Sequence, residues 1–185
     1  MDEYELADDD LIQRISEKDL ASFQILVERH KALVYNTCYN FIGNHQQAEE
    51  TAQDVFFQIY KSASAFRHKS KVSSWIYRIA VNRSLNVIRH NKRSRRITSL
   101  IALEIERSGA EEPGKLLEKK ELKDLLKAAV DSLPDKLRTV FILNKHENLS
   151  PGEIADILDI SINSVEVRIH RAKSKLQKKL ASLLT

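Results

Sequence analysis

The sequence predicts an all-α protein made of two small helical domains joined by a flexible linker. Glycine occurs four times and proline three times in 185 residues, far too rarely for a turn-rich β fold. Leu, Ile, Ala, Lys, Arg, Glu and Gln dominate the composition, and most of these are good helix formers. Apolar residues recur at steps of three and four, which is the repeat of an amphipathic helix.

The first predicted domain, residues 1–96, is expected to contain four helices. Its acidic start, residues 1–9, is expected to be frayed, and Asp9 or Asp10 is expected to cap a short helix. The apolar pattern predicts three longer helices, at residues 19–42, 46–62 and 72–91, and Asp19 or Ser22 is expected to open the first of them. Gly43 is expected to end the first of these three, because glycine adopts the left-handed C-cap conformation without steric cost.

The linker, residues 97–116, is predicted from its loss of periodicity and its two glycines, with a helical stretch at residues 100–106 as a further option. The second domain, residues 117–185, is expected to follow. Its predicted helices span residues 115–132, 134–146, 153–158 and 163–183. Ser150 and Glu153 have the spacing of a capping box, and Pro151 suits a first helical position. The last two helices and the short turn between them form a helix-turn-helix pattern.

Charge is strongly segregated along the chain, although the formal net charge is only +4. Residues 1–54 sum to −8, whereas residues 55–103 contain eleven Lys or Arg and no Asp or Glu. The latter window also holds six of the twelve aromatic residues, among them Trp75, which equally suits a core position. A basic and aromatic segment is typical of a surface that contacts phosphates and bases, whereas an ordinary solvated surface mixes both signs.

Two helical patterns predict interaction surfaces. The last helix is basic, and residues 167–185 contain no acid, which favours insertion into a DNA major groove over a plain helical hairpin. Glu50, Gln53 and Asp54 share one face of the helix at 46–62 by their spacing. This face is interpreted either as a solvated surface or as a docking site for another protein.

Other classes of function find little support in the sequence. The single cysteine, Cys38, excludes an internal disulfide and the usual structural zinc sites, and its position predicts a buried side chain. The histidines do not have the spacing of metal ligands, and the sequence contains no recognisable phosphate-loop or nucleophile motif. We therefore expect no metal, no cofactor, no small-molecule substrate and no enzyme activity. Apolar runs fall short of the ~20 residues that span a membrane, and the acidic first residues are not expected to act as a signal peptide. A cytoplasmic location is therefore expected.

Four motifs in order resemble the extracytoplasmic function (ECF) sigma factors of bacterial RNA polymerase. Residues 48–56 (AEETAQDVF) are similar to the core-binding helix of region two. Residues 66–82 resemble the F-R…W-L-Y-R-I-A-x-N signature of that region. Residues 133–141 match the L-P-x-x-x-R-x-V-F opening of region four, and residues 164–172 resemble its recognition helix.

The resemblance implies a dissociable polymerase subunit that recognises promoters and opens DNA without ATP. Glu50, Gln53 and Asp54 match positions that bind the β′ clamp helices, and the β flap is a further implied partner. The implied contacts to the minus-ten element, double- and single-stranded, are Phe66, Arg67, Lys69, Lys71, Trp75, Arg78, Asn82, Arg83 and Arg89. The implied contacts to the minus-thirty-five duplex are Ser164, Glu166, Val167, Arg168, Arg171 and Lys175. An anti-sigma factor is implied as a regulator.

The pair Glu166-Val167 departs from the basic or small polar residues of many relatives. Glutamate can accept a hydrogen bond from cytosine N4, and valine can contact a thymine methyl. We therefore expect an unusual minus-thirty-five preference. Two other functions remain as alternatives: a dimeric helix-turn-helix regulator, which leaves the basic aromatic segment without a role, and a recombinase-like enzyme, which lacks a carboxylate cluster in that segment.

Overall fold

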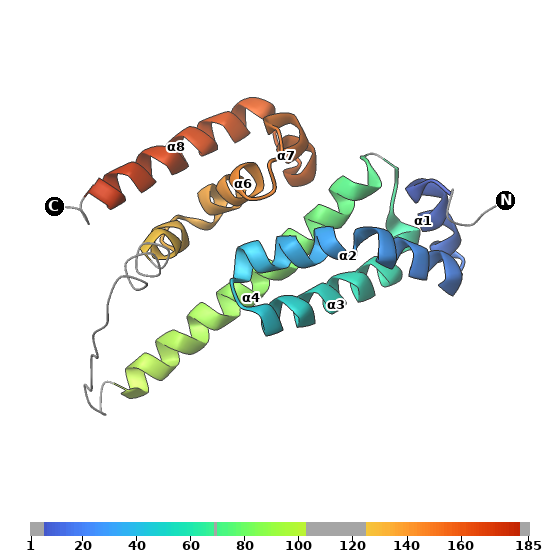
Figure 1. The fold of residues 1–185 in the computed structure, drawn as a ribbon, viewed down its shortest axis with the longest axis horizontal. Coiled ribbons are helices and arrows are strands. Elements are labelled where there is room, and N and C mark those ends of the chain that lie inside the picture. The colour runs from blue at the N-terminus through green and yellow to red at the C-terminus, as the bar shows by residue number, and fades with distance from the viewer. Residues whose placement is uncertain (1–5, 69, 103–124, 182–185) are drawn as a thin grey trace, which may run out of the picture. The chain divides into compact units, whose positions relative to one another are not determined.

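The computed structural model describes residues 6–68, 70–102 and 125–181, with side chains except at 93–102. These residues form helices and turns, and none of them belongs to a strand. The chain divides into two compact units, formed mainly by the residues before and after position 91. The prediction of an all-α protein is therefore confirmed, and each unit is described below by itself (Figure 1).

The described residues of the first unit form four α-helices and one 3-10 turn. Their bounds are α1 Asp8–Ser16, α2 Leu20–Ile42, α3 His45–Ser62, η2 Ala63–Ala65 and α4 Val72–Ala102. Helix α2 packs along α3 and against α1, as the ribbon shows (Figure 1). The apolar stripes of these helices meet in one core, with Cys38 fully buried as predicted. Burial of such stripes is the main source of stability for helices of this length.

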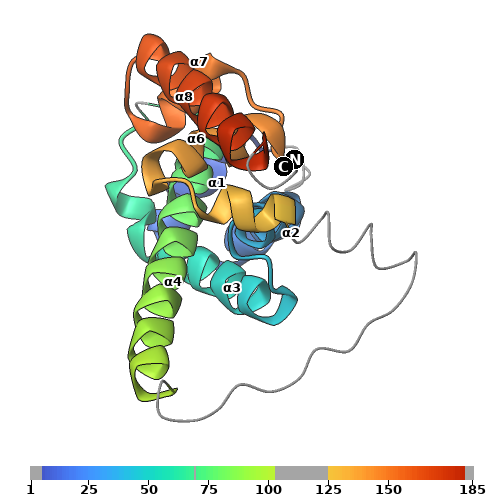
Figure 2. The ribbon, with the colours of Figure 1, turned by 90° about the vertical axis from the view of Figure 1, so that its left-hand side faces the viewer.

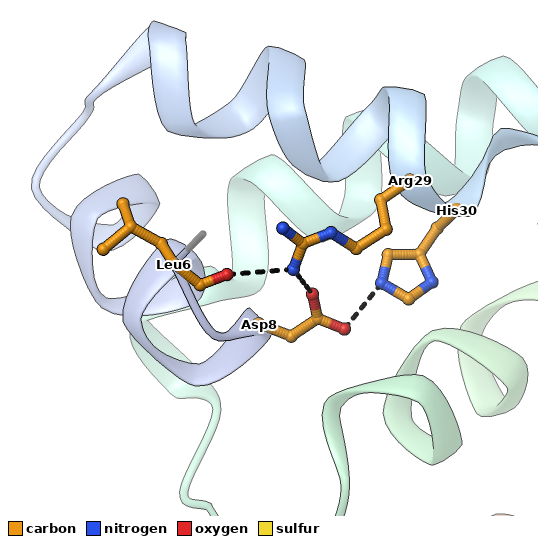
Figure 3. A network of polar contacts seen from close by, with 4 residues as sticks. All are labelled: Leu6, Asp8, Arg29 and His30. Atoms are coloured by element: carbon orange, nitrogen blue, oxygen red, sulfur yellow. Dashed lines mark hydrogen bonds and ion pairs between the residues drawn. The ribbon is translucent and has the colours of Figure 1, made fainter. Parts of the chain in front are cut away.

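The start of α1 differs from the prediction. The N-cap is Ala7, which makes no side-chain capping bond, and the three aspartates that follow occupy the first helical turn, where the helix dipole favours negative charge. Asp8 is held by an ion pair with Arg29 and by a 2.7 Å contact between its Oδ2 and Nε2 of His30 (Figure 3). Arg29 also donates to the backbone oxygen of Leu6. This network fixes α1 on α2, so Asp8 and Asp9 are not frayed.

The ends of α2 agree with the prediction. The Asp19 carboxylate accepts from the Ala21 N–H at 2.9 Å and from the Ser22 hydroxyl at 2.7 Å. Gly43 ends the helix with φ of 70°, the left-handed conformation that favours glycine. Asn44 then caps α3 through a bond from the Gln47 N–H, a capping role that was not predicted.

Helix α4 is longer than predicted, because it continues past residue 91 to Ala102. The apolar periodicity fades there, but neither proline nor glycine interrupts residues 92–102, and their Lys, Arg and Leu favour a helix. The weaker apolar repeat after residue 91 therefore did not mark the end of the helix. Residues 97–102 of the predicted linker are helical, and 103–116 lie outside the described residues, so the domain limits at 96 and 117 stay predictions.

The second unit contains a helical segment at 125–131 and three further helices. Their bounds are α6 Asp135–Lys145, α7 Pro151–Leu158 and α8 Ile162–Ala181. Helices α6 and α8 pack against each other, and both views show them adjacent (Figure 2). Ala129, Leu133, Ala172 and Leu176 form part of the core. Most of the predicted helix at 115–132 lies outside the described residues, and Pro134 is an N-cap and not the first helical residue.

Candidate functional site

Helix α3 separates a buried face from an exposed one. Ala48, Ala52, Val55 and Ile59 are buried in the core of the first unit. The three residues predicted to bind core polymerase, Glu50, Gln53 and Asp54, all lie exposed on the outward side of the helix. The structure therefore brings this predicted set together. Its local charge is negative, so it suits a basic partner surface.

Phe57 belongs to the same outward surface and was absent from the predicted set. It follows Asp54 by three residues and lies opposite Ile59 and Val55, and 57% of it is exposed. The Lys61 ammonium sits 4.2 Å from the centre of the Phe57 ring, one turn further along. Aromatic side chains are enriched at protein interfaces, so Phe57 is a candidate contact on this surface. The helical repeat could have identified Phe57, because it places this ring opposite the apolar stripe.

The loop between η2 and α4 contains the first predicted minus-ten residues. Arg67 and Lys71 are exposed, whereas Phe66 is half-buried. The Phe66 ring lies 5.0 Å from the Trp75 ring, and both pack against the core of the first unit. Both rings are therefore partly used for packing, as the sequence suggested for Trp75. Lys69 lies outside the described residues.

The remaining predicted minus-ten residues lie along α4 but do not form one set. Arg78, Asn82 and Arg89 follow at steps of four and seven, so they share a helix face with Trp75. Arg83 lies on another side, where its Nη2 donates to Oε1 of Gln58 in α3 at 2.6 Å. This half-buried bond ties α4 to α3. Arg83 thus has a structural contact within the first unit, and its contact with DNA stays a prediction.

Helix α8 presents a basic surface opposite its buried stripe. Val165, Ile169, Ala172 and Leu176 face the core. The helical repeat places the predicted duplex-contacting residues at three positions on the outward side of α8. Val167 and Arg171 lie at the centre of that side. Ser164, Arg168 and Lys175 lie on one flank, and Glu166 lies on the opposite flank. Exposed Asn163, His170 and Lys178 share the centre and were not predicted. The same helical repeat could have added them.

Local capping bonds fix the turn that leads into α8. The predicted capping box is present: the Ser150 N–H donates to Glu153 Oε2 at 2.8 Å, and the Glu153 N–H donates to Ser150 Oγ at 3.3 Å. Ser161 caps α8 by accepting from the Ser164 N–H at 3.2 Å. Because these bonds set where α7 and α8 begin, they orient the basic surface of α8.

The described part of the chain contains neither a candidate metal cluster nor a candidate membrane-spanning helix. Within the described ranges, no group of three His, Cys, Asp or Glu residues is arranged to hold a metal ion. No helix in that part of the chain is long and apolar enough to cross a membrane. The candidate site consists of the acidic surface of α3, the basic loop with α4, and the basic surface of α8.

Comparisons with known proteins match both units in order. The family model described as Sigma-70 region 2 matches residues 26–94, and the model described as Sigma-70, region 4 matches residues 123–176. The chain is 32% identical to the ECF RNA polymerase sigma factor SigW of Bacillus subtilis over 180 residues. That alignment covers 93% of this chain and 96% of SigW.

Two solved structures share the fold. One is CnrH in complex with the cytosolic domain of CnrY, with a TM-score of 0.65 and 21% identity, covering 95% of this chain and 97% of CnrH. The other is the sigma factor RpoE in complex with the anti-sigma factor NepR from Bartonella quintana, with a TM-score of 0.59 and 23% identity. It covers 86% of this chain and 96% of the matched chain.

Proposed function

The chain belongs to the family of ECF RNA polymerase sigma factors, and on this premise we propose that it binds core polymerase, recognises promoter DNA and opens the minus-ten region. The observation that carries the proposal is that one chain has both an acidic outward surface, on α3, and a basic outward surface, on α8. Each surface lies in one of the two matched family regions. The role requires recognition and binding, not catalysis by this chain.

We propose that α3 docks on the β′ clamp helices of core polymerase. Glu50, Gln53 and Asp54 project from one side of a helix whose opposite side is locked in the core. A rigid helix loses little conformational entropy on binding, which favours affinity. The acidic charge would also speed encounter with a basic partner and make the association sensitive to salt.

Opening of the minus-ten region is proposed to depend on the basic loop and α4. Exposed Arg67 and Lys71 can contact phosphates, and Asn82 can hydrogen-bond a base edge. Unstacking and unpairing a base costs a few kcal/mol, and one captured stack returns about 1–3 kcal/mol. Binding unpaired bases more strongly than paired ones can therefore open the duplex without ATP.

Recognition of the minus-thirty-five element is proposed for α8. A helix-turn-helix places its second helix in the major groove, with the first residues near bases and later basic residues near phosphates. Val167 and Arg171 lie at the centre of the exposed surface and suit base contacts, while Lys175 suits a phosphate. Neutralising several phosphates should make promoter binding fall steeply with salt.

Regulation by an anti-sigma factor is also proposed. The two structures that share this fold are complexes, and RpoE is bound to the anti-sigma factor NepR. A partner that covers the acidic surface of α3 would compete directly with core polymerase. A cytoplasmic location, where polymerase and chromosome are found, is part of the same proposal.

Run-off transcription with core polymerase tests the proposed function. We expect promoter-specific transcripts from a genomic library only when this protein is added to core. Absence of both a transcript and a stable complex with core would contradict the proposal. A palindromic footprint made by the protein without polymerase would instead support the dimeric regulator, and metal-dependent cleavage of DNA would support the enzyme.

A further inference from the structure

A carboxylate from α1 holds the loop that precedes α4. Oδ1 of Asp9 lies 2.7 Å from Nδ1 of His68, although 59 residues separate the two in sequence. His68 lies in the basic loop that we propose contacts the minus-ten strand. Its backbone is left-handed, with φ of 54°. That conformation is uncommon outside glycine and persists only where surrounding contacts stabilise it.

Two ring contacts continue this connection into α4. The rings of His68 and Phe66 meet in an edge-type arrangement, with centroids 4.7 Å apart. Phe66 in turn lies 5.0 Å from Trp75 in the first turn of α4. The loop is thus tied at one end to α1 through Asp9 and at the other to α4 through Trp75. These contacts over-determine the backbone at His68.

We propose that Asp9 is a positioning residue that orders this loop for the single-stranded minus-ten DNA. The inference rests on the proposed function. A loop already held in one conformation loses less entropy when DNA binds, so the pair should raise affinity for the opened strand. The two side chains are half exposed, 52% for His68 and 57% for Asp9, so the expected effect is modest.

The negative charge of Asp9 makes the test sharp. An acid beside a loop that meets phosphates should repel DNA, so charge alone predicts tighter binding when Asp9 is removed. Positioning predicts the opposite sign. Asp10 is the matched control, because it lies exposed in the same helical turn and its removal changes the charge equally.

The test uses reconstituted holoenzyme with the full chain. Affinity for a fluorescent single-stranded minus-ten oligonucleotide and the extent of promoter opening are measured for Asp9→Ala, Asp10→Ala, His68→Ala and the Asp9→Ala/His68→Ala double variant. We expect Asp9→Ala and His68→Ala each to lower the affinity for the oligonucleotide and the extent of promoter opening by about two- to fivefold. The double variant should lose no more than the larger single effect, because both changes break one contact. Asp10→Ala should leave affinity unchanged or raise it.

A conservative variant separates positioning from simple loss of structure. Asparagine tolerates the left-handed backbone and can still donate a hydrogen bond, so His68→Asn should retain more affinity than His68→Ala. Core binding should stay unchanged in every variant. The proposal is overturned if Asp9→Ala behaves like Asp10→Ala, or if it weakens core binding to the same degree. If wild-type holoenzyme opens no promoter, the proposed function itself fails and this inference fails with it.

Discussion

Helices α3 and α8 are built on one plan and carry opposite charge. Each buries a stripe of small and branched apolar residues, ending in Ile59 on α3 and Leu176 on α8. Opposite that stripe, α3 exposes carboxylates and Phe57, whereas α8 exposes Val167 and basic residues. The inward stripe stabilises the unit and the outward surface selects the partner. Substitutions can therefore change stability and binding separately.

The largest expected effect on stability comes from a change in the inward stripe of α3. Ile59 is fully buried, so Ile59→Ala should lower the free energy of unfolding by about 2–4 kcal/mol through lost burial and the cavity left behind. Chemical denaturation measures this. Phe57→Ala, two residues away on the same helix, is the control and should stay within about 0.5 kcal/mol of wild type. Equal losses in both variants would show that Phe57 is a packing residue.

Binding to core polymerase should depend on the outward surface of α3. Asp54→Lys should weaken core affinity at least tenfold, because it reverses a charge at the docking surface, and Phe57→Ala should weaken it about tenfold as loss of an aromatic anchor. Titration of labelled protein with core polymerase measures both. Leu20→Ala, which removes another exposed apolar side chain of the same unit, should have no effect.

Duplex binding should depend on the outward surface of α8. Arg171→Ala should weaken minus-thirty-five binding about tenfold while core affinity stays unchanged. Fluorescence anisotropy over a series of salt concentrations measures it. If Arg171 contacts a phosphate, the loss will be similar for all sequences and the salt slope will fall by about one.

Glu166→Ala should alter specificity more than affinity. Glu166 lies on the flank of α8, where it can read one base and repels phosphate. A promoter selection assay should therefore give a different minus-thirty-five preference for this variant. An unchanged base preference would mean that Glu166 does not face the bases.

Loss of the capping box should have a smaller effect on stability. Ser150→Ala removes the hydroxyl that accepts from Glu153 N–H and should cost about 1 kcal/mol. Thermal unfolding of the variant measures this. Gln177→Ala, on the exposed side of α8, is the control and should leave the melting temperature unchanged. Because the box sets where α7 begins, duplex affinity should fall with stability while core affinity does not.

The smallest effect concerns the cap of α2, which belongs to neither outward surface. The hydrogen bond from the Ser22 hydroxyl holds the pKa of the Asp19 carboxyl below its ordinary 3.8. A depressed pKa contributes stability above the ordinary value, and that contribution disappears as pH falls through the lower, folded value. The melting temperature of Asp19→Asn should therefore depend less on pH below about pH 4 than that of wild type. Asparagine also caps helices well, so stability near neutral pH should hold.

Local chemistry made much of the fold predictable. The Asp19 cap, the left-handed Gly43 and the Ser150–Glu153 box each depend on residues within a few positions of one another. The apolar repeat likewise identified the buried stripes and placed Glu50 and Asp54 on one exposed face. The end of α4 was missed, because the apolar repeat weakens after residue 91 although the Lys, Arg and Leu there still favour a helix.

The sequence by itself determined where most helices lie, several of their caps and which side of each helix is buried, because these depend on neighbours one or two turns away. Only the tertiary structure decided which distant side chains meet. Asp8 with Arg29, Asp9 with His68 and Arg83 with Gln58 join separate elements. Such pairs depend on how helices pack and how loops turn, and the helical repeat carries no information on either. For that reason the hydrogen bond between Arg83 and Gln58 of α3 was not predicted, and the DNA contact of Arg83 stays a prediction.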